Sequence, residues 1–336
     1  MLARVAESLY WTARNLERAE NVGRMLEVTH ALALDSGADQ VGAEVWEPAI
    51  EATGDMQLFR EHHLRADERS AVWFLTFSDL NPNSLRACVS RARENARGVR
   101  DALPPDVWEA LNALDQTVAR WTASRLAQDG VFQLCLDVRR GLRLVEGSVD
   151  AEMMRDAAWH FLNLGRFLER ASTAARLLEA RWRVSGVMSL EGAREVPPAE
   201  WRALVGAAVT PSTLMAASPG ELTPDAAVRL LVMDERFPRS VTYALQRVED
   251  SLLELEACGA SGRGATGRDM VAEVRHMLTQ LDPPPSGAAL TELLDGLQKQ
   301  CNLIGAQIAA CFFDYPHDDP TGHDRQRPQA ARQAQN

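Results

Sequence analysis

The chain has 336 residues and a formal net charge of -11, with 36 Lys and Arg against 47 Asp and Glu. This excess of acidic residues argues against general binding to nucleic acid, whose phosphates require clustered Lys and Arg, and it weakens attraction to anionic lipid. A hydrophobic content of 46% with 25% charged residues is typical of a globular protein. The length allows one large domain or two average ones.

Neither the cysteines nor the apolar stretches point to export or to a membrane. The five cysteines are scattered, with no CxxC or Cys/His cluster, so we expect neither a structural zinc site nor a disulfide framework. Charged residues interrupt the first 14 residues, unlike a signal peptide. The longest uncharged stretch, 203–220, is broken by Pro211 and Pro219. We therefore expect a cytoplasmic protein.

Taken in order, the chain predicts helices only. Apolar residues step by three and four, and no run alternates as a half-buried strand requires. Asn81-Pro82 is a strong start signal, because Asn caps free amides and Pro suits the first helical position. We expect helices over residues 2–34, 48–53, 65–77, 82–102, 106–127, 131–145, 151–184, 198–209, 225–233, 238–258, 268–281 and 288–312. The tail, 317–336, has almost no apolar residue and is expected to be disordered.

A charged segment of the first helix returns later in the chain. Residues 14–27 read RNLERAENVGRMLE and residues 166–179 read RFLERASTAARLLE, which gives 8 identities in 14 positions at an offset of 152. A weaker match at an offset of 156 relates the start of the helix at Pro82 and Ser84 to Pro238 and Ser240. Self-similarity of this kind predicts duplicated structure. We expect a multi-helix bundle built from two pseudo-two-fold-related halves, about 1–150 and 151–316.

Both copies of the repeated helix carry a polar stripe beside their apolar face. Residues three and four apart are neighbours on a helix, so each copy presents an Arg-Glu-Arg ladder. We expect the two ladders to meet in a polar seam, whose candidate binding residues are Glu7, Trp11, Arg14, Glu17, Arg18, Arg166, Glu169 and Arg170. Two interpretations stay open. Either the guanidinium groups converge on a carboxylate or phosphate ligand, or each Arg pairs with a Glu in a buried network that fixes helix register.

Other chemistry has weaker support. Glu27 and His30, like Glu273 and His276, have the Glu-x-x-His spacing of carboxylate-bridged di-metal bundles. Their separation of 246 residues follows neither repeat offset, so we predict no metal site. The sequence also lacks the GxSxG, HExxH and GxxxxGK[ST] motifs. No catalytic residue and no cofactor are therefore assigned.

In the two copies of the repeated helix, the chain resembles the bacterial alpha-E family, helical proteins named for a Glu-Arg motif. The resemblance lies in the two LERA segments at 16–19 and 168–171, in VAESLYW at 5–11, and in RDAAWHFLNLGRFLERA at 155–171. It extends to NPNS at 81–84, ARENAR at 92–97, WEAL at 108–111 and PRS at 238–240. It covers Met1 to about Phe313 and implies a single alpha-E helical domain over 1–316. One position departs: Ala157 follows Arg155-Asp156, where such sequences usually place an acid.

The resemblance also implies a partner. Alpha-E proteins are encoded beside, or fused to, circularly permuted ATP-grasp ligases, and often accompany transglutaminase-like proteases. This context implies an accessory subunit in ATP-dependent amide-bond formation that binds the ligase and a peptide or amino-acid substrate. The alternative is a stand-alone enzyme that uses an Arg-lined groove for acyl or aminoacyl transfer. Whether the chain forms a homo-oligomer, and which face meets a partner, stays open.

Overall fold

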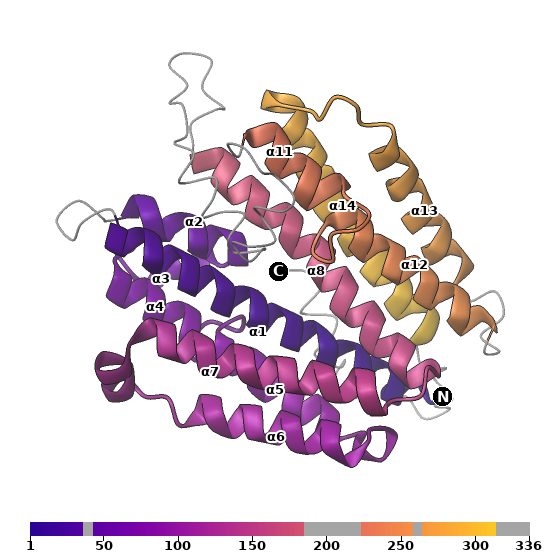
Figure 1. Cartoon of the computed structure of the whole chain (residues 1–336), viewed down its shortest axis with the longest axis horizontal. Helices are drawn as coiled ribbons and strands as arrows, with labels where there is room; N and C mark the ends of the chain where they lie inside the picture. Colours follow the sequence, from indigo (N-terminus) through magenta and orange to yellow (C-terminus); the bar gives the residue numbers. More distant parts are fainter. Residues whose placement is uncertain (36–42, 185–222, 258–263, 314–336) are drawn as a thin grey trace, which may run out of the picture.

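The computed structural model describes residues 1–35, 43–184, 223–257 and 264–313. These residues form helices joined by short connectors, with no strand among them, which confirms the all-α prediction. Two long helices, α1 (Ala3–Asp35) and α8 (Ala157–Val184), lie against each other through the middle of the molecule (Figure 1). They are the two copies of the repeated helix. None of the described helices combines the length and the apolarity that crossing a bilayer requires.

The other helices surround these two. Between α1 and α8 in the chain come α2 (Ala43–Thr53), α3 (Met56–His62), α4 (Glu68–Thr76), α5 (Leu85–Arg97), the 3-10 turn Arg100–Ala102, α6 (Pro105–Ala119) and α7 (Ala123–Glu152). After α8 the described helices are α11 (Pro224–Val228), which continues into the π-helical turn Arg229–Met233, α12 (Val241–Ala257), α13 (Ala265–Thr279) and α14 (Gly287–Phe312).

The same order of packing occurs twice. Helices α5 and α7 pack on α1, and α6 packs on both of them; α12 and α14 pack on α8, and α13 packs on both of those. Figure 1 shows the first group on one side of the central pair and the second group on the other. The helix partners therefore correspond between the groups. The pseudo-two-fold relation of the complete halves, 1–150 and 151–316, stays a prediction.

Several predicted boundaries are wrong because cap residues override periodicity. Ser84 and Ser240, which the predicted helices 82–102 and 238–258 include, lie just before the helices instead: their hydroxyls accept hydrogen bonds from the amides of Ala87 and Tyr243, as N-caps do. Helix α5 therefore begins at Leu85 rather than at 82. Helix α8 begins at Ala157 rather than 151, because Asp156 accepts from the amides of the first turn.

Helices in the middle of the first group also differ from the prediction. The predicted helix 106–127 ends at Ala119, and Thr122 caps a new helix by accepting from the amide of Arg125. The expected break at Gly130 is present inside α7, where this glycine has φ 83° and ψ 167°. Helix α3 was not predicted. The expected helix over 198–209 and the tail over 317–336 lie outside the described residues.

A close approach of α1 and α8 depends on one glycine. A β-carbon built on Gly165 of α8 would lie 2.1 Å from the carbonyl oxygen of Tyr10 in α1. Because that contact is with backbone, no side-chain rotation could relieve it. Gly165 therefore sets how near the two helices come, and with it the reach of the side chains between them.

Candidate functional site

The first of two ion-pair clusters between α1 and α8 is centred on Glu169. This carboxylate is 0% exposed and accepts hydrogen bonds from Nε of Arg14 and Nε of Arg18, both at 2.8 Å. Arg176 places a guanidinium nitrogen 3.6 Å from the same carboxylate. We call these four residues the Glu169 cluster. Burial alone would raise the pKa of Glu169, but the guanidinium groups of Arg18 and Arg14 outweigh it and hold the pKa well below its usual range.

Polar and aromatic groups surround the Glu169 cluster. Arg18 donates to Oδ1 of Asn83 at 2.7 Å, and Asn83 donates to Oδ1 of Asp55 at 2.8 Å. Arg14 donates to the hydroxyl of Tyr10 at 2.9 Å and lies 5.4 Å from the ring centre of Trp11. These contacts fix the orientation of both α1 arginines from two sides.

The second cluster repeats the central pair in the opposite direction. Here Arg170 of α8 binds Glu17 of α1 through two hydrogen bonds, Nε to Oε1 at 2.8 Å and Nη2 to Oε2 at 2.6 Å. The Arg170 and Glu17 side chains are only 6% and 1% exposed. Such a bidentate pair is among the strongest polar contacts in proteins. Each helix thus supplies the Glu of one central pair and the Arg of the other.

Further charges join Glu17 and Arg170. Glu20 binds Arg24 at 2.9 Å and also accepts a hydrogen bond from Arg239, which lies just before α12. Glu146 of α7 binds Arg166 at 2.7 Å. We call the resulting set the Glu17 cluster: Glu17, Glu20, Glu146, Arg24, Arg166, Arg170 and Arg239.

The titration behaviour of the Glu17 cluster follows from burial and from the sign of its neighbours. Burial would raise the pKa of Glu20, yet Arg239 and Arg24 lower it to about 2. Burial lowers the pKa of Arg239 to about 10, although Glu20 opposes the shift. Burial also raises the pKa of Glu146, with Arg166 opposing.

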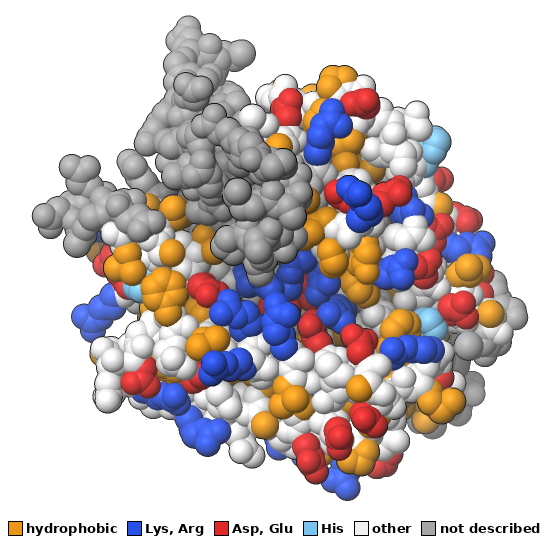
Figure 2. Space-filling view, in the orientation of Figure 1, with side chains coloured by type: hydrophobic (Ala, Val, Ile, Leu, Met, Phe, Trp, Pro, Cys, Tyr) orange, Lys and Arg blue, Asp and Glu red, His pale blue; other side chains and the backbone are white. Residues whose placement is uncertain are grey.

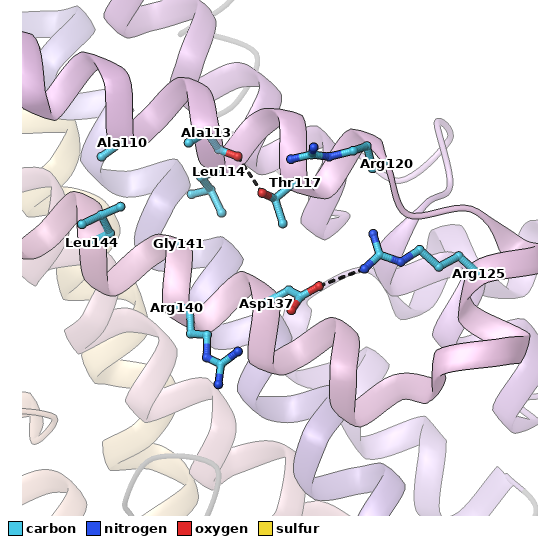
Figure 3. A pocket seen from close by; sticks show the side chains of 10 residues that line it. All are labelled: Ala110, Ala113, Leu114, Thr117, Arg120, Arg125, Asp137, Arg140, Gly141 and Leu144. Atoms are coloured by element: carbon cyan, nitrogen blue, oxygen red, sulfur yellow. Dashed lines mark hydrogen bonds and ion pairs between the residues drawn. The ribbon is translucent and has the colours of Figure 1, made fainter.

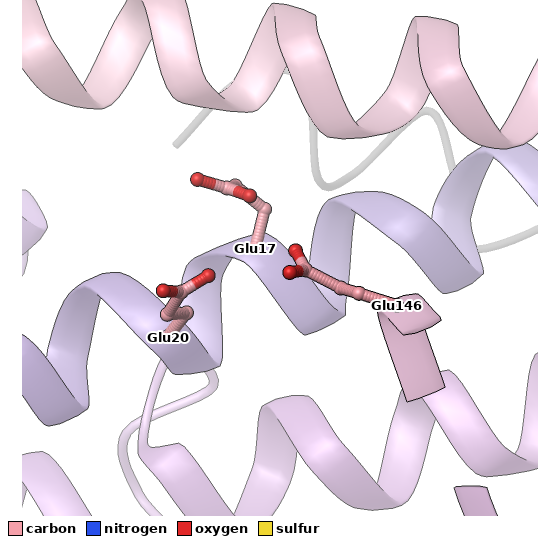
Figure 4. Close-up of side chains that lie close together, drawn as sticks. All are labelled: Glu17, Glu20 and Glu146. Atoms are coloured by element: carbon pink, nitrogen blue, oxygen red, sulfur yellow. The ribbon is translucent and has the colours of Figure 1, made fainter. Parts of the chain in front are cut away.

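Three carboxylates of this cluster lie close enough together to resemble a metal site. Oxygen atoms of Glu17, Glu20 and Glu146 lie within 4.8 Å of one another (Figure 4). The four guanidinium groups of the cluster already bring one positive charge more than these three acids carry, 4 - 3 = +1. A divalent cation would add repulsion, so the donor set does not suit a metal.

The two Glu-x-x-His motifs do not change this conclusion. Glu27 forms an ion pair with Arg139 of α7 at 2.5 Å, and Nδ1 of His30 lies 3.0 Å from a carboxylate oxygen of Glu68 in α4. The second motif, Glu273 and His276, belongs to α13.

The structure distributes the predicted seam residues as follows. Arg14, Arg18 and Glu169 share one cluster, and Glu17, Arg166 and Arg170 share the other. Trp11 lies against Arg14. Glu7 is half-buried, which raises its pKa, and it forms no ion pair with any residue in the described part of the chain. Of the two interpretations of the ladders, a ligand held by free guanidinium groups or Arg-Glu pairs, the geometry shows Arg and Glu groups of opposite helices paired with each other.

The predicted seam residues did not include Arg24 and Arg176 of the two repeated helices, and sequence reasoning missed five further members or neighbours of the clusters: Glu20, Asp55, Asn83, Glu146 and Arg239. A signal existed for two of them, because Asn83 and Arg239 occupy the same position of the second repeat, 239 - 83 = 156. Both meet the seam, one through Arg18 and the other through Glu17 and Glu20.

Two hollows lie near charged residues. A cavity of about 30 Å³ between α1 and α8 is lined by Asn21, Met25, Arg170, Thr173, Ala174, Leu177 and Arg239. A larger, open groove of about 490 Å³ lies between α6 and α7 (Figure 3). Figure 2 shows Lys and Arg side chains gathered over the middle of one face, where α1, α7 and α8 run in Figure 1.

Comparison with known protein families finds one whose description names a Glu-Arg (ER) motif. Residues 1–313 match the model of a family described as "a predicted alpha-helical domain with a conserved ER motif". The chain belongs to the Alpha-E family. In its Alpha-E fold, the Glu-Arg dipeptides Glu17-Arg18 and Glu169-Arg170 supply both central pairs of the seam.

Relatives of this Alpha-E chain occur in mycobacteria. An uncharacterized protein of Mycobacterium bovis is 28% identical over 346 residues, which covers 93% of this chain and 37% of that protein. Uncharacterized proteins of two Mycobacterium tuberculosis strains are 28% and 27% identical over the same shares of both chains. The chain thus spans little more than a third of these relatives' length. No solved structure matches it.

Proposed function

We propose that this Alpha-E protein is an accessory subunit of a circularly permuted ATP-grasp ligase and supports ATP-dependent amide-bond formation by binding the ligase and its substrate. The observation that carries the proposal is the length of the mycobacterial relatives, of which only 37% corresponds to this chain. In those proteins the similar region shares one polypeptide with a longer region. Covalent linkage raises the effective concentration of one region at the other, which favours a working contact between them.

The low pKa values of Glu169 and Glu20 in the seam support a binding role rather than catalysis. A general acid or base works best with a pKa near the working pH, but arginines hold the pKa of Glu169 well below its usual range and that of Glu20 at about 2. Burial raises the pKa of Cys135 and of Cys301 to about 12, so neither forms the thiolate that a nucleophile requires. These groups hold charge or stay neutral; they are not poised to exchange protons.

The groove between α6 and α7 is the surface that we propose for the ligase. Its lining combines apolar residues, among them the 57%-exposed Leu144, with three arginines and one aspartate, and Asp129 also pairs with the lining residue Arg125, which leaves 3 - 2 = +1. An apolar strip with a basic rim complements an acidic amphipathic helix. This charge runs against the net charge of the whole chain, so the groove selects for an acidic partner segment.

Co-expression with the ATP-grasp ligase, followed by affinity purification and mass spectrometry of the products, tests the proposal. We expect the two proteins to co-purify, and we expect nucleotide turnover only when the ligase is present. Leu144→Asp combined with Arg140→Glu should reduce co-purification about tenfold, since it removes apolar contact and reverses charge. Leu303→Asp on α14, at a residue 53% exposed, serves as the control.

Two outcomes would contradict the proposal. Failure of the wild-type proteins to co-purify would remove the partner role. Amide-bond formation or acyl transfer by the isolated chain, lost in Arg18→Ala without loss of folding, would instead establish the stand-alone enzyme.

A further inference from the structure

The small cavity between α1 and α8 borders the Glu17 cluster. It is lined by residues of both repeated helices and by Arg239, at the start of α12. Its volume of about 30 Å³ exceeds the roughly 10–15 Å³ that one water molecule needs. A small planar group such as a carboxylate therefore fits, with the remainder of its molecule outside.

A hydrogen-bond donor in this lining has no partner. Nδ2 of Asn21 is buried and bonds to no atom in the parts of the chain that the structure describes. Leaving a buried donor unpaired is unfavourable. Thr173, the residue that matches Asn21 at the repeat offset, 173 - 21 = 152, also lines the cavity. A ligand that accepts a hydrogen bond would satisfy the amide.

The guanidinium group of Arg239 supplies further donors. Its ion pairs with Glu17 and Glu20 use Nη1 and Nη2, while arginine has five N–H bonds in all. Arg239 lines the cavity together with Arg170 and Asn21, so two arginine side chains and one amide side chain border the same small space.

The charge of the cluster selects the sign and size of the ligand. Its four arginines and three glutamates leave one positive charge, 4 - 3 = +1. A single carboxylate neutralises that charge, whereas a phosphate dianion leaves an uncompensated negative charge beside Glu17 and Glu20. The rest of the lining is apolar, from Met25, Ala174 and Leu177, and suits a short aliphatic group.

We infer that this cavity binds the carboxylate of an amino acid or of a peptide C-terminus, with Asn21 and Arg239 as its donors. The choice of ligand rests on the proposed function, since amide-bond formation requires a carboxylate substrate. The site itself follows from the unpaired amide, the surplus guanidinium and the apolar wall.

Isothermal titration calorimetry of the full chain with N-acetyl-L-alanine tests the inference, because this probe carries one carboxylate and a short aliphatic side chain. N-acetyl-L-alanine amide, in which the charge is absent, and inorganic phosphate are the comparison probes. Asn21→Leu removes the unpaired amide at similar volume, and Arg239→Gln removes the guanidinium. Arg247→Gln, further along α12 in an exposed pair with Asp250, is the matched control.

We expect N-acetyl-L-alanine to bind the wild type and the Arg247→Gln variant equally, and each of the two cavity variants about tenfold more weakly, as loss of a hydrogen bond to a charged group implies. Asn21→Leu should unfold at or above the wild-type temperature, because it removes an unpaired buried donor, so it tests the site even if Arg239→Gln does not fold.

The inference fails if N-acetyl-L-alanine does not bind, if its neutral amide binds as well, if phosphate binds more tightly, or if Asn21→Leu leaves binding unchanged. Since the titration uses no ligase, its outcome is independent of co-purification. Binding of N-acetyl-L-alanine without co-purification would support the carboxylate site and contradict the ligase partner. Co-purification without binding would support the ligase partner and contradict the carboxylate site.

Discussion

The Glu169 cluster and the Glu17 cluster contain the same cross-helix pair but differ in what surrounds it. In α1, the first copy of the repeated helix, Glu20 lies one turn before Arg24 and pairs with it at 2.9 Å. In the second copy, the matching position is Ser172, so Arg176 depends on Glu169, at 3.6 Å. One glutamate therefore holds three arginines on one side, whereas three glutamates share four arginines on the other.

This difference separates two roles within one duplicated motif. The Glu169 carboxylate is fully enclosed and already bound by Arg14 and Arg18, which suits it to holding α1 and α8 together. The Glu17 cluster distributes its charge more evenly and adjoins a cavity with an unpaired donor, Asn21. We infer that the Glu169 cluster stabilises the crossing of α1 and α8 and that the Glu17 cluster borders the ligand site.

The largest expected effect comes from neutralising the single acid that holds three arginines. Glu169→Gln should lower the free energy of unfolding by about 3–5 kcal/mol, as expected when a buried charge network loses one sign. Glu17→Gln should cost about 2 kcal/mol, because Glu20 and Glu146 remain next to its arginines. Urea denaturation of both variants provides the measurement; equal losses would remove the distinction between the clusters.

A loss at the lower end of the range for Glu169→Gln is expected from adding one methyl group at the helix crossing. Gly165→Ala should destabilise the protein by about 3 kcal/mol, because the new β-carbon overlaps the Tyr10 backbone and forces α1 and α8 apart. Gly147→Ala in α7 is the control: a β-carbon added there would meet no atom within 4 Å, so a gain of about 0.5–1 kcal/mol is expected from helix propensity. A neutral Gly165→Ala variant would show that the crossing is looser than described.

The smallest effect is a change in pH dependence. Glu169 and Glu20 have a folded-state pKa below the ordinary value of 4.5, so their stabilisation is present above about pH 4.5 and is lost as the pH falls toward 2. Glu146, with its raised pKa, opposes this trend. Unfolding free energies measured from pH 7 to pH 3 should decline less steeply in Glu169→Gln than in the wild type. Parallel curves would mean that Glu169 is not held ionised.

Much of this fold follows from the sequence. Helical periodicity and the repeat identify α1 and α8, and the break at Gly130 follows from a residue that tolerates positive φ. Helix α3 was not predicted because its seven residues, Met56–His62, are too few to show a clear helical period. The boundaries at Ser84 and Asp156 were predicted wrongly because capping hydrogen bonds, not apolar spacing, decide where a helix begins.

The site is predictable to the extent that it is duplicated. Arg14, Glu17, Arg18, Glu169 and Arg170 are found because both helices carry them. Glu146 belongs to α7, and its pairing with Arg166 depends on how a third helix packs, which no local pattern records. Glu20 has no acidic counterpart in the second copy. The residues that distinguish the clusters are thus those in which the repeats differ, and a search for identity passes over them.

A double-mutant cycle tests most directly whether the repeated Glu-Arg dipeptides pair across α1 and α8. The pairs to measure are Arg18 with Glu169 and Arg170 with Glu17, by urea denaturation of the single and double Gln variants. We predict a coupling energy of about 2 kcal/mol for each pair, and none for Arg18 with Arg247, which lies in an exposed pair of its own with Asp250. Additive losses within both pairs would contradict a paired Glu-Arg seam between α1 and α8.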